Sequence, residues 1–358
     1  MRRGTTAGTA AGVACAVLAL SVPAPAGAEQ VKLGDVQRAI TNLAKTDGVV
    51  GAIGEVYVGG ERVGKGTAGS RLLGGKGGRI PSDSRFRIAS QTKLMEATVV
   101  LQLVGEGKLG LDGKLGDLLP EHDFPDGAET ITVRDLIRHT SGIPDFLESG
   151  AFDVFDFTTA YKPIDLVKAA YTLPLGELGR YRYSTTNYVL LGMIIERVTG
   201  HDRAVEFKRR LFAPLGMKST YLATRVSDRI KGPHGHGYSP DAKGRPRDVD
   251  RLNATSYGAE GAISTAHDVS AFYRALGQGK LVPADLQRQL PRPFPGLCGG
   301  TVSSASGGMP GITSTTFSSA DGRIQFAVAA TLKVDNEKAT AVGEAVNRAA
   351  EAVLCPGP

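Results

Sequence analysis

The sequence predicts a mixed α/β (α+β) protein in which both chain ends build one antiparallel sheet, flanked by helices, around an inserted and mainly helical domain. Three observations lead to this prediction. Strand-like runs joined by glycine turns lie near both ends, and the segment between them has helical periodicity. The chain of 358 residues is also long enough for one large domain or two interlocked ones.

The first residues have the pattern of an export signal. Residues 1–28 combine Arg2 and Arg3, an apolar run, and the small residues Ala26-Gly27-Ala28, which is typical of a secretory signal peptide. The apolar run is shorter than the roughly 20 residues that cross a membrane. We therefore expect a secreted protein, extracellular or in the cell envelope, with no membrane span.

Residues 29–80 are predicted to supply the first part of the sheet. A helix over 35–45 carries its apolar residues on one face, and strand-like runs over 49–58 and 62–68 follow. The Gly59-Gly60 pair between the two runs is a hairpin signal.

Residues 81–290 are predicted to form the inserted helical domain. An amphipathic run covers 94–104, and a second helical segment over 188–198 ends at Gly200, which suits a helix C-cap. A Ser-Thr pair precedes the apolar run 269–276 and can cap a helix there.

Residues 291–358 return to sheet. Runs over 312–318 and 323–332 alternate around Asp321-Gly322, which predicts a second hairpin, and 337–353 has the pattern of an amphipathic helix. This segment and the N-terminal sheet segment together are predicted to form one discontinuous sheet domain.

The charge balance gives no support for a nucleic-acid partner. Of 42 Lys and Arg, Arg2 and Arg3 lie in the signal, which leaves 40 against 36 Asp and Glu, a net charge of +4. Basic residues are neither clustered nor interleaved with aromatic ones. A loose attraction to an anionic cell wall is the most that this charge permits.

The cysteines predict one disulfide. Cys15 lies within the signal, so Cys298 and Cys355 are the remaining pair in an oxidising compartment. A bridge between them would contribute roughly 3 to 4 kcal/mol by loop closure. Two free buried thiols are the alternative.

The strongest indication of chemistry is the run Ser90-Gln91-Thr92-Lys93 at a predicted helix start. Residues three apart lie on one helical face, so the Lys93 amine can reach the Ser90 hydroxyl. An amine whose pKa is lowered by desolvation can activate a serine for attack on a carbonyl. We therefore expect Ser90 as nucleophile and uncharged Lys93 as its base, against the alternative of an incidental pair on a solvated helix.

Several segments in a fixed order resemble the penicillin-recognising serine hydrolases, which include class C β-lactamases, secreted D-alanyl-D-alanine carboxypeptidases and related esterases. They are 86–93, 101–109, 136–144 and 183–192. The resemblance implies a β-lactamase/transpeptidase-like fold, one β-lactamase-related catalytic unit, and no cofactor. The positions of the two late cysteines are most similar to the secreted carboxypeptidase branch. We further expect a monomer.

The resemblance implies roles for the first two motifs. Ser90 and Lys93 match the nucleophile and base, and Tyr183 matches the Tyr of the Tyr-x-Asn motif, which shuttles protons to the leaving group. A packed core aromatic is the alternative for Tyr183. Thr185 takes the place of the motif's Asn in substrate binding, and it offers one hydroxyl where Asn offers an amide.

The third motif of the family, His/Lys-Thr/Ser-Gly on a sheet-edge strand, maps to Ala305-Ser306-Gly307. The hydroxyl of Ser306 and the Gly at 307 are kept, but the cationic or donor residue is lost. By resemblance, the backbone N–H of Gly308 pairs with that of Ser90 as an oxyanion hole. Residues 291–297 contain three prolines, which argue against a central strand, and they are shorter than a family segment that includes carboxylate-binding residues.

The histidines are predicted to be structural. His139 belongs to the family's His-Thr-Ser-Gly turn. His234-Gly235-His236 resembles a metal-binding pair, but we find no carboxylate or cysteine at ligand spacing, so we expect no metal.

The leading hypothesis is a secreted serine hydrolase that forms an acyl-enzyme at Ser90, of the D-alanyl-D-alanine carboxypeptidase or esterase type. Its partner would be a small-molecule or peptide substrate, such as a peptidoglycan stem peptide, a β-lactam or a small ester. The altered motifs favour weak or shifted activity. The alternative is a catalytically silent protein that binds cell-wall peptides or a partner.

Overall fold

The structure, a computed structural model, describes residues 1, 31–291, 294–333 and 336–356. The signal peptide prediction for 1–28 lies outside the described residues. Residues Leu33–Pro358 form one compact unit, and the division of this unit into a sheet domain and a helical domain stays a prediction. No helix in the described part of the chain has the length and apolarity to cross a membrane.

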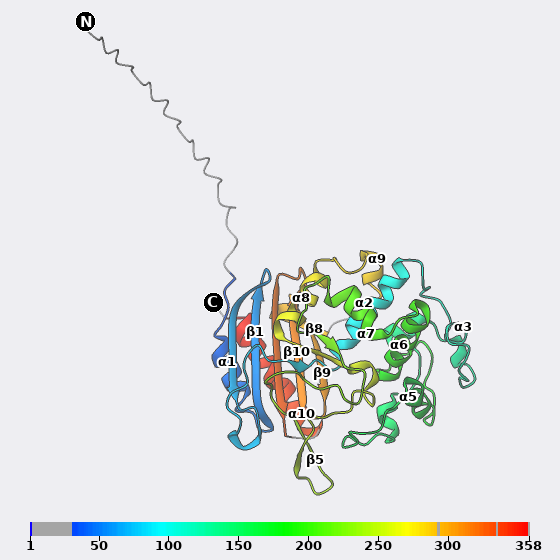
Figure 1. The fold of residues 1–358 in the computed structure, drawn as a ribbon, viewed down its shortest axis with the longest axis horizontal. Coiled ribbons are helices and arrows are strands. Elements are labelled where there is room, and N and C mark those ends of the chain that lie inside the picture. Colours follow the sequence, from blue (N-terminus) through cyan, green and yellow to red (C-terminus); the bar gives the residue numbers. More distant parts are fainter. Residues whose placement is uncertain (2–30, 292–293, 334–335, 357–358) are drawn as a thin grey trace. The chain divides into compact units, whose positions relative to one another are not determined.

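One six-stranded antiparallel sheet is built from both ends of the chain, in the order β2-β1-β11-β10-β9-β8. Figure 1 shows the blue N-terminal strands beside the orange C-terminal ones. The arrangement confirms the predicted fold class. The strands are β1 (Val49–Val58), β2 (Glu61–Gly69), β8 (Phe294–Leu297), β9 (Val302–Met309), β10 (Ile312–Ser319) and β11 (Ile324–Leu332).

Both predicted hairpins are confirmed. β1 and β2 join at Gly59 and Gly60, whose φ angles of 64° and 97° suit glycine, and β10 and β11 join at the turn that contains Gly322, with φ 66°. The two chain ends meet where β1 pairs with β11, with Val56 opposite Phe326.

The central strands β1 and β11 are buried on both faces. Along β11, Phe326 and Val328 belong to one apolar cluster while Ala327 and Ala329 belong to another, as the two-residue repeat of a strand requires. Helices α1 (Val36–Leu43) and α10 (Asn336–Leu354) contribute to the first cluster. Helix α8 (Ala266–Gly277) and the inserted helices contribute to the second.

The inserted segment is mainly helical, as predicted. Helix α6 (Thr185–Thr199) ends at Gly200 in a left-handed conformation, and the Thr265 hydroxyl caps α8 by accepting from the Asp268 N–H. The other α-helices of this segment are α2 (Gln91–Gly105), α3 (Leu115–Leu118), α4 (Val133–Arg138), α5 (Pro163–Ala170), α7 (Arg203–Phe207) and α9 (Ala284–Gln287).

The short strands in this segment were not predicted from the sequence, because a strand of two or three residues is too short to show a periodic pattern. Strand β7 (Ala262–Ser264) pairs with β3 (Phe86–Arg87) and with β4 (Tyr221–Leu222). A separate hairpin pairs β5 (Tyr238–Pro240) with β6 (Pro246–Asp248). The β3–β7 pairing matters most, because it brings the residues before 262 next to the residues around Ser90.

The proline-rich segment over 291–297 is not a central strand, as predicted. Its strand β8 lies at the sheet edge, and its pairing with β9 is limited to Phe294 with Ser304 and Leu297 with Val302. Just after β8, Cys298 forms the predicted disulfide with Cys355 beyond the end of α10, with a Cα–Cα distance of 5.3 Å.

Candidate active site

Ser90 lies at the N-terminus of α2, where the backbone is tightly constrained. Ala89 before it has φ 48° although it is not glycine, a conformation that costs roughly 1 to 2 kcal/mol. On β9, a Cβ added to Gly307 would lie 2.2 Å from the Ile88 carbonyl oxygen and 2.7 Å from the Ser90 nitrogen. Only glycine therefore lets β9 run directly against the backbone of the nucleophile.

Three side chains meet the Ser90 hydroxyl. The Tyr183 hydroxyl donates to Ser90 Oγ at 2.9 Å, and Lys93 Nζ donates to the same atom at 3.3 Å. Ser90 in turn donates to Glu260 Oε1 at 2.5 Å. Tyr183, which contacts the Ser90 hydroxyl, is 41% exposed, so solvent can reach the Ser90 hydroxyl from this side. The structure thus brings together the three residues that the sequence proposed as catalytic.

Glu260 is the residue that sequence reasoning missed. It ends a short 3-10 turn (Gly258–Glu260) just before β7, and its Oε1 also accepts from Lys93 Nζ at 2.5 Å. Both partners of this ion pair are 4% exposed. One sequence feature could have indicated Glu260: it is a lone acidic residue in a stretch of small and apolar residues, where a buried charge is costly unless it has a partner.

The expectation that the Lys93 amine is uncharged is wrong. Burial by itself lowers the pKa of Lys93, but the Glu260 carboxylate and the Tyr183 side chain raise that pKa above its ordinary value. Lys93 is therefore an ammonium at neutral pH. Desolvation alone would favour the uncharged amine, but the carboxylate of Glu260, 167 residues further along the chain, favours the ammonium.

His139 holds Tyr183 in place, in keeping with its predicted structural role. Its ring stacks on the Tyr183 ring with centroids 4.5 Å apart, and its Nδ1 accepts from the Ser184 N–H at 3.1 Å. Burial and then the Lys93 ammonium lower the pKa of His139 to about 3, so the ring is neutral. A neutral ring can stack beside Lys93 without adding a second positive charge.

Thr185, proposed as a substrate-binding residue, is not brought to the nucleophile. It is 1% exposed, and both its N–H and its hydroxyl donate to Asp145 Oδ2, at 2.9 and 2.8 Å. Nearby, Asn187 is also fully buried, and its Oδ1 accepts from the Ser141 hydroxyl. The Thr185 hydroxyl and the Asn187 Oδ1 are thus engaged inside the protein.

The residues proposed for the third motif lie on β9. Ser306 is exposed, and its hydroxyl lies 3.0 Å from Thr315 Oγ1 on β10. Gly307 packs on the Ser90 backbone as described, and Gly308 pairs with Thr313. Ala305 contributes no charge. On this strand it is therefore the backbone at Gly307 that lies against Ser90, while the Ser306 hydroxyl is engaged with β10.

A second buried ion pair lies one turn further along α2. Glu96 Oε1 accepts from Arg203 Nη1 at 3.2 Å, and Arg203 Nη2 donates to the Gly258 carbonyl at 2.6 Å. Burial raises the pKa of Glu96 to about 7, although Arg203 lowers it. Arg203 thus fixes the turn that carries Glu260.

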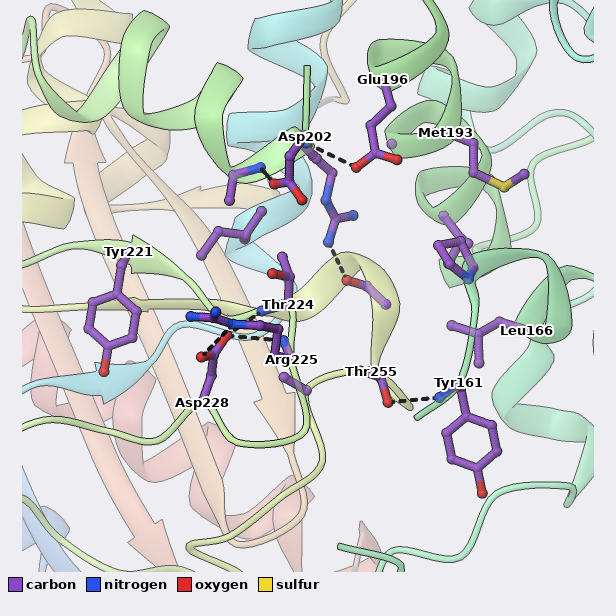
Figure 2. Close-up of a pocket in the computed structure, with 18 of the residues that line it drawn as sticks. Tyr161, Leu166, Met193, Glu196, Asp202, Tyr221, Thr224, Arg225, Asp228 and Thr255 are labelled. Atoms are coloured by element: carbon purple, nitrogen blue, oxygen red, sulfur yellow. Dashed lines mark hydrogen bonds and ion pairs between the residues drawn. The ribbon is translucent and has the colours of Figure 1, made fainter. Parts of the chain in front are cut away.

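A cavity of about 640 Å³ lies on the other side of Arg203. Figure 2 shows its walls, which come from α5, α6, α7, β4 and the segments around Thr224 and Thr255. Several of its charged groups have partners within the wall: Glu196 accepts from the Arg203 backbone N–H and Arg225 pairs with Asp228. Ser90 does not line this cavity, so it is not the reaction site.

His234, His236 and Asp250 form a group that could hold a metal ion, with candidate ligand atoms within 4.8 Å of one another. The expectation that no carboxylate lies at ligand spacing is wrong, because the chain around the β5–β6 hairpin returns two aspartates. Each histidine is already paired: His234 Nε2 lies 2.8 Å from Asp250 Oδ1, and His236 Nδ1 lies 2.8 Å from Asp248 Oδ2.

Comparison with known proteins identifies relatives for most of this architecture. Residues 36–323 match the model of the Beta-lactamase family. Penicillin-binding protein 4 of Amycolatopsis lactamdurans is 30% identical over 210 residues, which are 56% of this chain and 52% of that protein. Esterase EstB of Burkholderia gladioli is 33% identical over 168 residues, 43% of each chain. The chain thus spans about half the length of these curated relatives.

Solved structures match a larger share of this chain. A D-stereospecific amidohydrolase from Streptomyces sp. has a TM-score of 0.74 at 28% identity, covering 90% of this chain and 98% of its own. The D-amino acid amidase from Ochrobactrum anthropi SV3, complexed with L-phenylalanine amide, has a TM-score of 0.75 at 26% identity, covering 88% and 97%. The shared fold confirms the resemblance found in the sequence.

Proposed function

Because this chain belongs to the Beta-lactamase family, we propose that it is a serine hydrolase that forms an acyl-enzyme at Ser90 and acts on small esters and amides. The observation that carries the proposal is the convergence of Tyr183, Lys93 and Glu260 on one accessible hydroxyl. A nucleophile within hydrogen-bond reach of proton-handling groups is the arrangement that acyl transfer needs.

Each group has a chemical role in this proposal. Ser90 Oγ attacks the substrate carbonyl, and the Lys93 ammonium, 3.3 Å away, stabilises negative charge as it develops. Tyr183 lies at the exposed side of Oγ, where its hydroxyl can give a proton to the leaving group. The N–H groups of Ser90 and Gly308 would receive the carbonyl oxygen.

Substrates without a free terminal carboxylate suit this site best. Position 305 carries Ala where a cationic or donor residue would bind a carboxylate, and the Thr185 hydroxyl is engaged by Asp145. Relatives named as an esterase and as D-amino acid amidases support ester and amide substrates. Cleavage of peptidoglycan stem peptides ending in D-Ala-D-Ala has less support from these residues.

The disulfide supports the proposal that the protein is exported. A bridge such as Cys298–Cys355 persists in oxidising compartments and is rare in a reducing cytoplasm. N-terminal sequencing of the protein recovered from culture medium or envelope should begin after residue 28. Recovery of the uncleaved chain from the cytoplasm alone would contradict export.

The proposed activity is tested with a fluorophosphonate probe, followed by mass spectrometry of the labelled peptide. We expect one adduct on Ser90, its loss in Ser90→Ala, and its retention in Ser306→Ala, which changes an exposed serine of β9. Turnover of p-nitrophenyl acetate and D-phenylalanine amide should depend on Ser90 in the same way. Binding of muropeptides without labelling or turnover would instead favour the catalytically silent protein.

A further inference from the structure

We infer that Glu260 is the general base of this site, both for acylation of Ser90 and for hydrolysis of the acyl-enzyme, so that the acyl group is released rather than retained. The inference rests on the proposed function, because it takes Ser90 as the nucleophile. It adds a catalytic residue and the fate of the intermediate.

The hydrogen bonds around Ser90 assign the direction of its proton. Oγ accepts from the Tyr183 hydroxyl and from the Lys93 ammonium, and a hydroxyl has one proton of its own. That proton points to Glu260 Oε1, at 2.5 Å. Among the described residues, Glu260 is the one whose side chain accepts a hydrogen bond from Ser90 Oγ.

Lys93 cannot take this role in the structure observed. An ammonium has three donors and no lone pair, so it offers a positive charge and no proton acceptor. Its contact with Glu260 Oε1 at 2.5 Å compensates the buried negative charge of the carboxylate. The pair therefore divides the work: Glu260 accepts the proton and Lys93 stabilises charge.

The backbone holds Glu260 rigidly enough for this role. Arg203 Nη2 binds the Gly258 carbonyl two residues before it, and β7 pairs with β3 two residues after it. Gly261 fits against Ala223, where an added Cβ would lie 2.3 Å from the Ala223 carbonyl oxygen. A carboxylate fixed from both sides keeps its distance to Oγ, which a general base requires.

Acylation then proceeds with a balanced set of bonds. The Ser90 O–H bond breaks and its proton moves to Glu260 Oε1 as Oγ bonds to the carbonyl carbon, whose π electrons move to oxygen. When the bond to the leaving group breaks, that group takes the Tyr183 proton. Lys93 interacts with both Tyr183 and Glu260, so it returns a proton to Tyr183 and receives the one held by Glu260.

Deacylation uses the same carboxylate. Once Ser90 is acylated it has no proton to donate, and Glu260 Oε1 is free to accept one from a water beside the ester. The water oxygen bonds to the acyl carbon as its proton moves to Glu260. The bond between that carbon and Oγ then breaks, and Oγ recovers the proton, which leaves a carboxylic acid and the free enzyme.

The decisive variant is Glu260→Gln, which keeps the size of the side chain and removes the base. With p-nitrophenyl acetate we expect steady turnover to fall on the order of 100-fold to 10,000-fold. Because p-nitrophenolate leaves readily, acylation by this ester needs the base less than deacylation does, so acetyl-Ser90 should accumulate in intact-mass spectra, whereas the wild type stays largely free. Glu96→Gln is the matched control, a buried and ion-paired glutamate without contact to Ser90, and it should turn over like the wild type.

Chemical rescue provides a second test that does not depend on the Gln variant folding. Glu260→Ala should regain at least about 10-fold in turnover with formate and none with nitrate, a planar anion too weakly basic to accept the proton. Turnover by Glu260→Gln close to the wild-type rate without acetyl-Ser90, or equal effects of formate and nitrate, would overturn the inference alone. Failure of every form, wild type included, to acylate Ser90 would instead overturn the proposed function.

Discussion

Helix α2 carries two buried ion pairs one turn apart, Lys93 with Glu260 and Glu96 with Arg203. They are alike in burial and in charge. The first contacts a hydroxyl that solvent can reach, whereas the second contacts a backbone carbonyl. A buried charge pair therefore becomes a reaction site only where it contacts an atom that can form and break bonds.

The two pairs also respond differently to pH. The pKa of Lys93 is raised above its ordinary value, so its contribution to stability is present throughout the neutral range and is lost only at strongly alkaline pH. The pKa of Glu96 is raised to about 7, mainly by burial, so this group changes charge near neutrality. Near neutral pH, Lys93 of the first pair keeps its charge, whereas Glu96 of the second pair titrates.

The largest expected effect comes from removing the charge of the first pair. Lys93→Met leaves Glu260 buried without a partner, which should cost about 3 to 5 kcal/mol of stability. It also removes the cation beside Oγ, so turnover of p-nitrophenyl acetate should fall at least about 1,000-fold. Urea unfolding and steady-state kinetics measure the two effects.

Lys93→Arg sharpens this test, because guanidinium keeps the charge and cannot act as a base. We expect it to retain more turnover than Lys93→Met. Equal loss in both variants would indicate that proton transfer through Lys93, rather than its charge alone, limits turnover.

Breaking the second pair should affect stability more than chemistry. Arg203→Met leaves Glu96 buried without its cation and frees the Gly258 carbonyl, with an expected loss of about 3 to 5 kcal/mol in the free energy of unfolding. Because every contact to Ser90 remains, turnover measured well below the melting temperature should fall by about 10-fold or less. A loss as large as that of Lys93→Met would place Arg203 in the catalytic group.

The smallest effect is the pH dependence that Glu96 imposes. Its folded pKa of about 7 lies above the ordinary 4.5, so its contribution to stability is present below pH 4.5 and is lost as pH rises through 7, by up to about 3 kcal/mol. Glu96→Gln cannot ionise and should flatten this decline. Melting temperatures at about pH 5 and pH 8 measure it, and an unchanged slope would contradict the assignment.

The sequence predicted the parts of the molecule that carry local or ordered signals. The hairpins at Gly59-Gly60 and Asp321-Gly322 follow from turn chemistry, and the disulfide follows from counting cysteines outside the signal. Ser90, Lys93 and Tyr183 were proposed from motifs whose order matches a family, and the structure places them together.

What the sequence could not predict depends on contacts between distant segments. Glu260 reaches Ser90 through the β3–β7 pairing, which is two residues long and leaves no periodic pattern. Thr185 is turned inward by Asp145, 40 residues earlier, and no local rule specifies that contact. The charge of Lys93 is set by Glu260, so an argument from desolvation alone gave the wrong protonation state.

The Cys298–Cys355 bond closes a loop with a sequence separation of 57 immediately before β9, the strand that packs on the Ser90 backbone. Loop closure of this size is worth about 4 kcal/mol. In recombinant protein from an ordinary reducing bacterial host, the strand that packs on the Ser90 backbone would therefore lack this covalent crosslink. Preparations from an oxidising host should be preferred for kinetic work, since specific activity would otherwise vary with the fraction of crosslinked molecules.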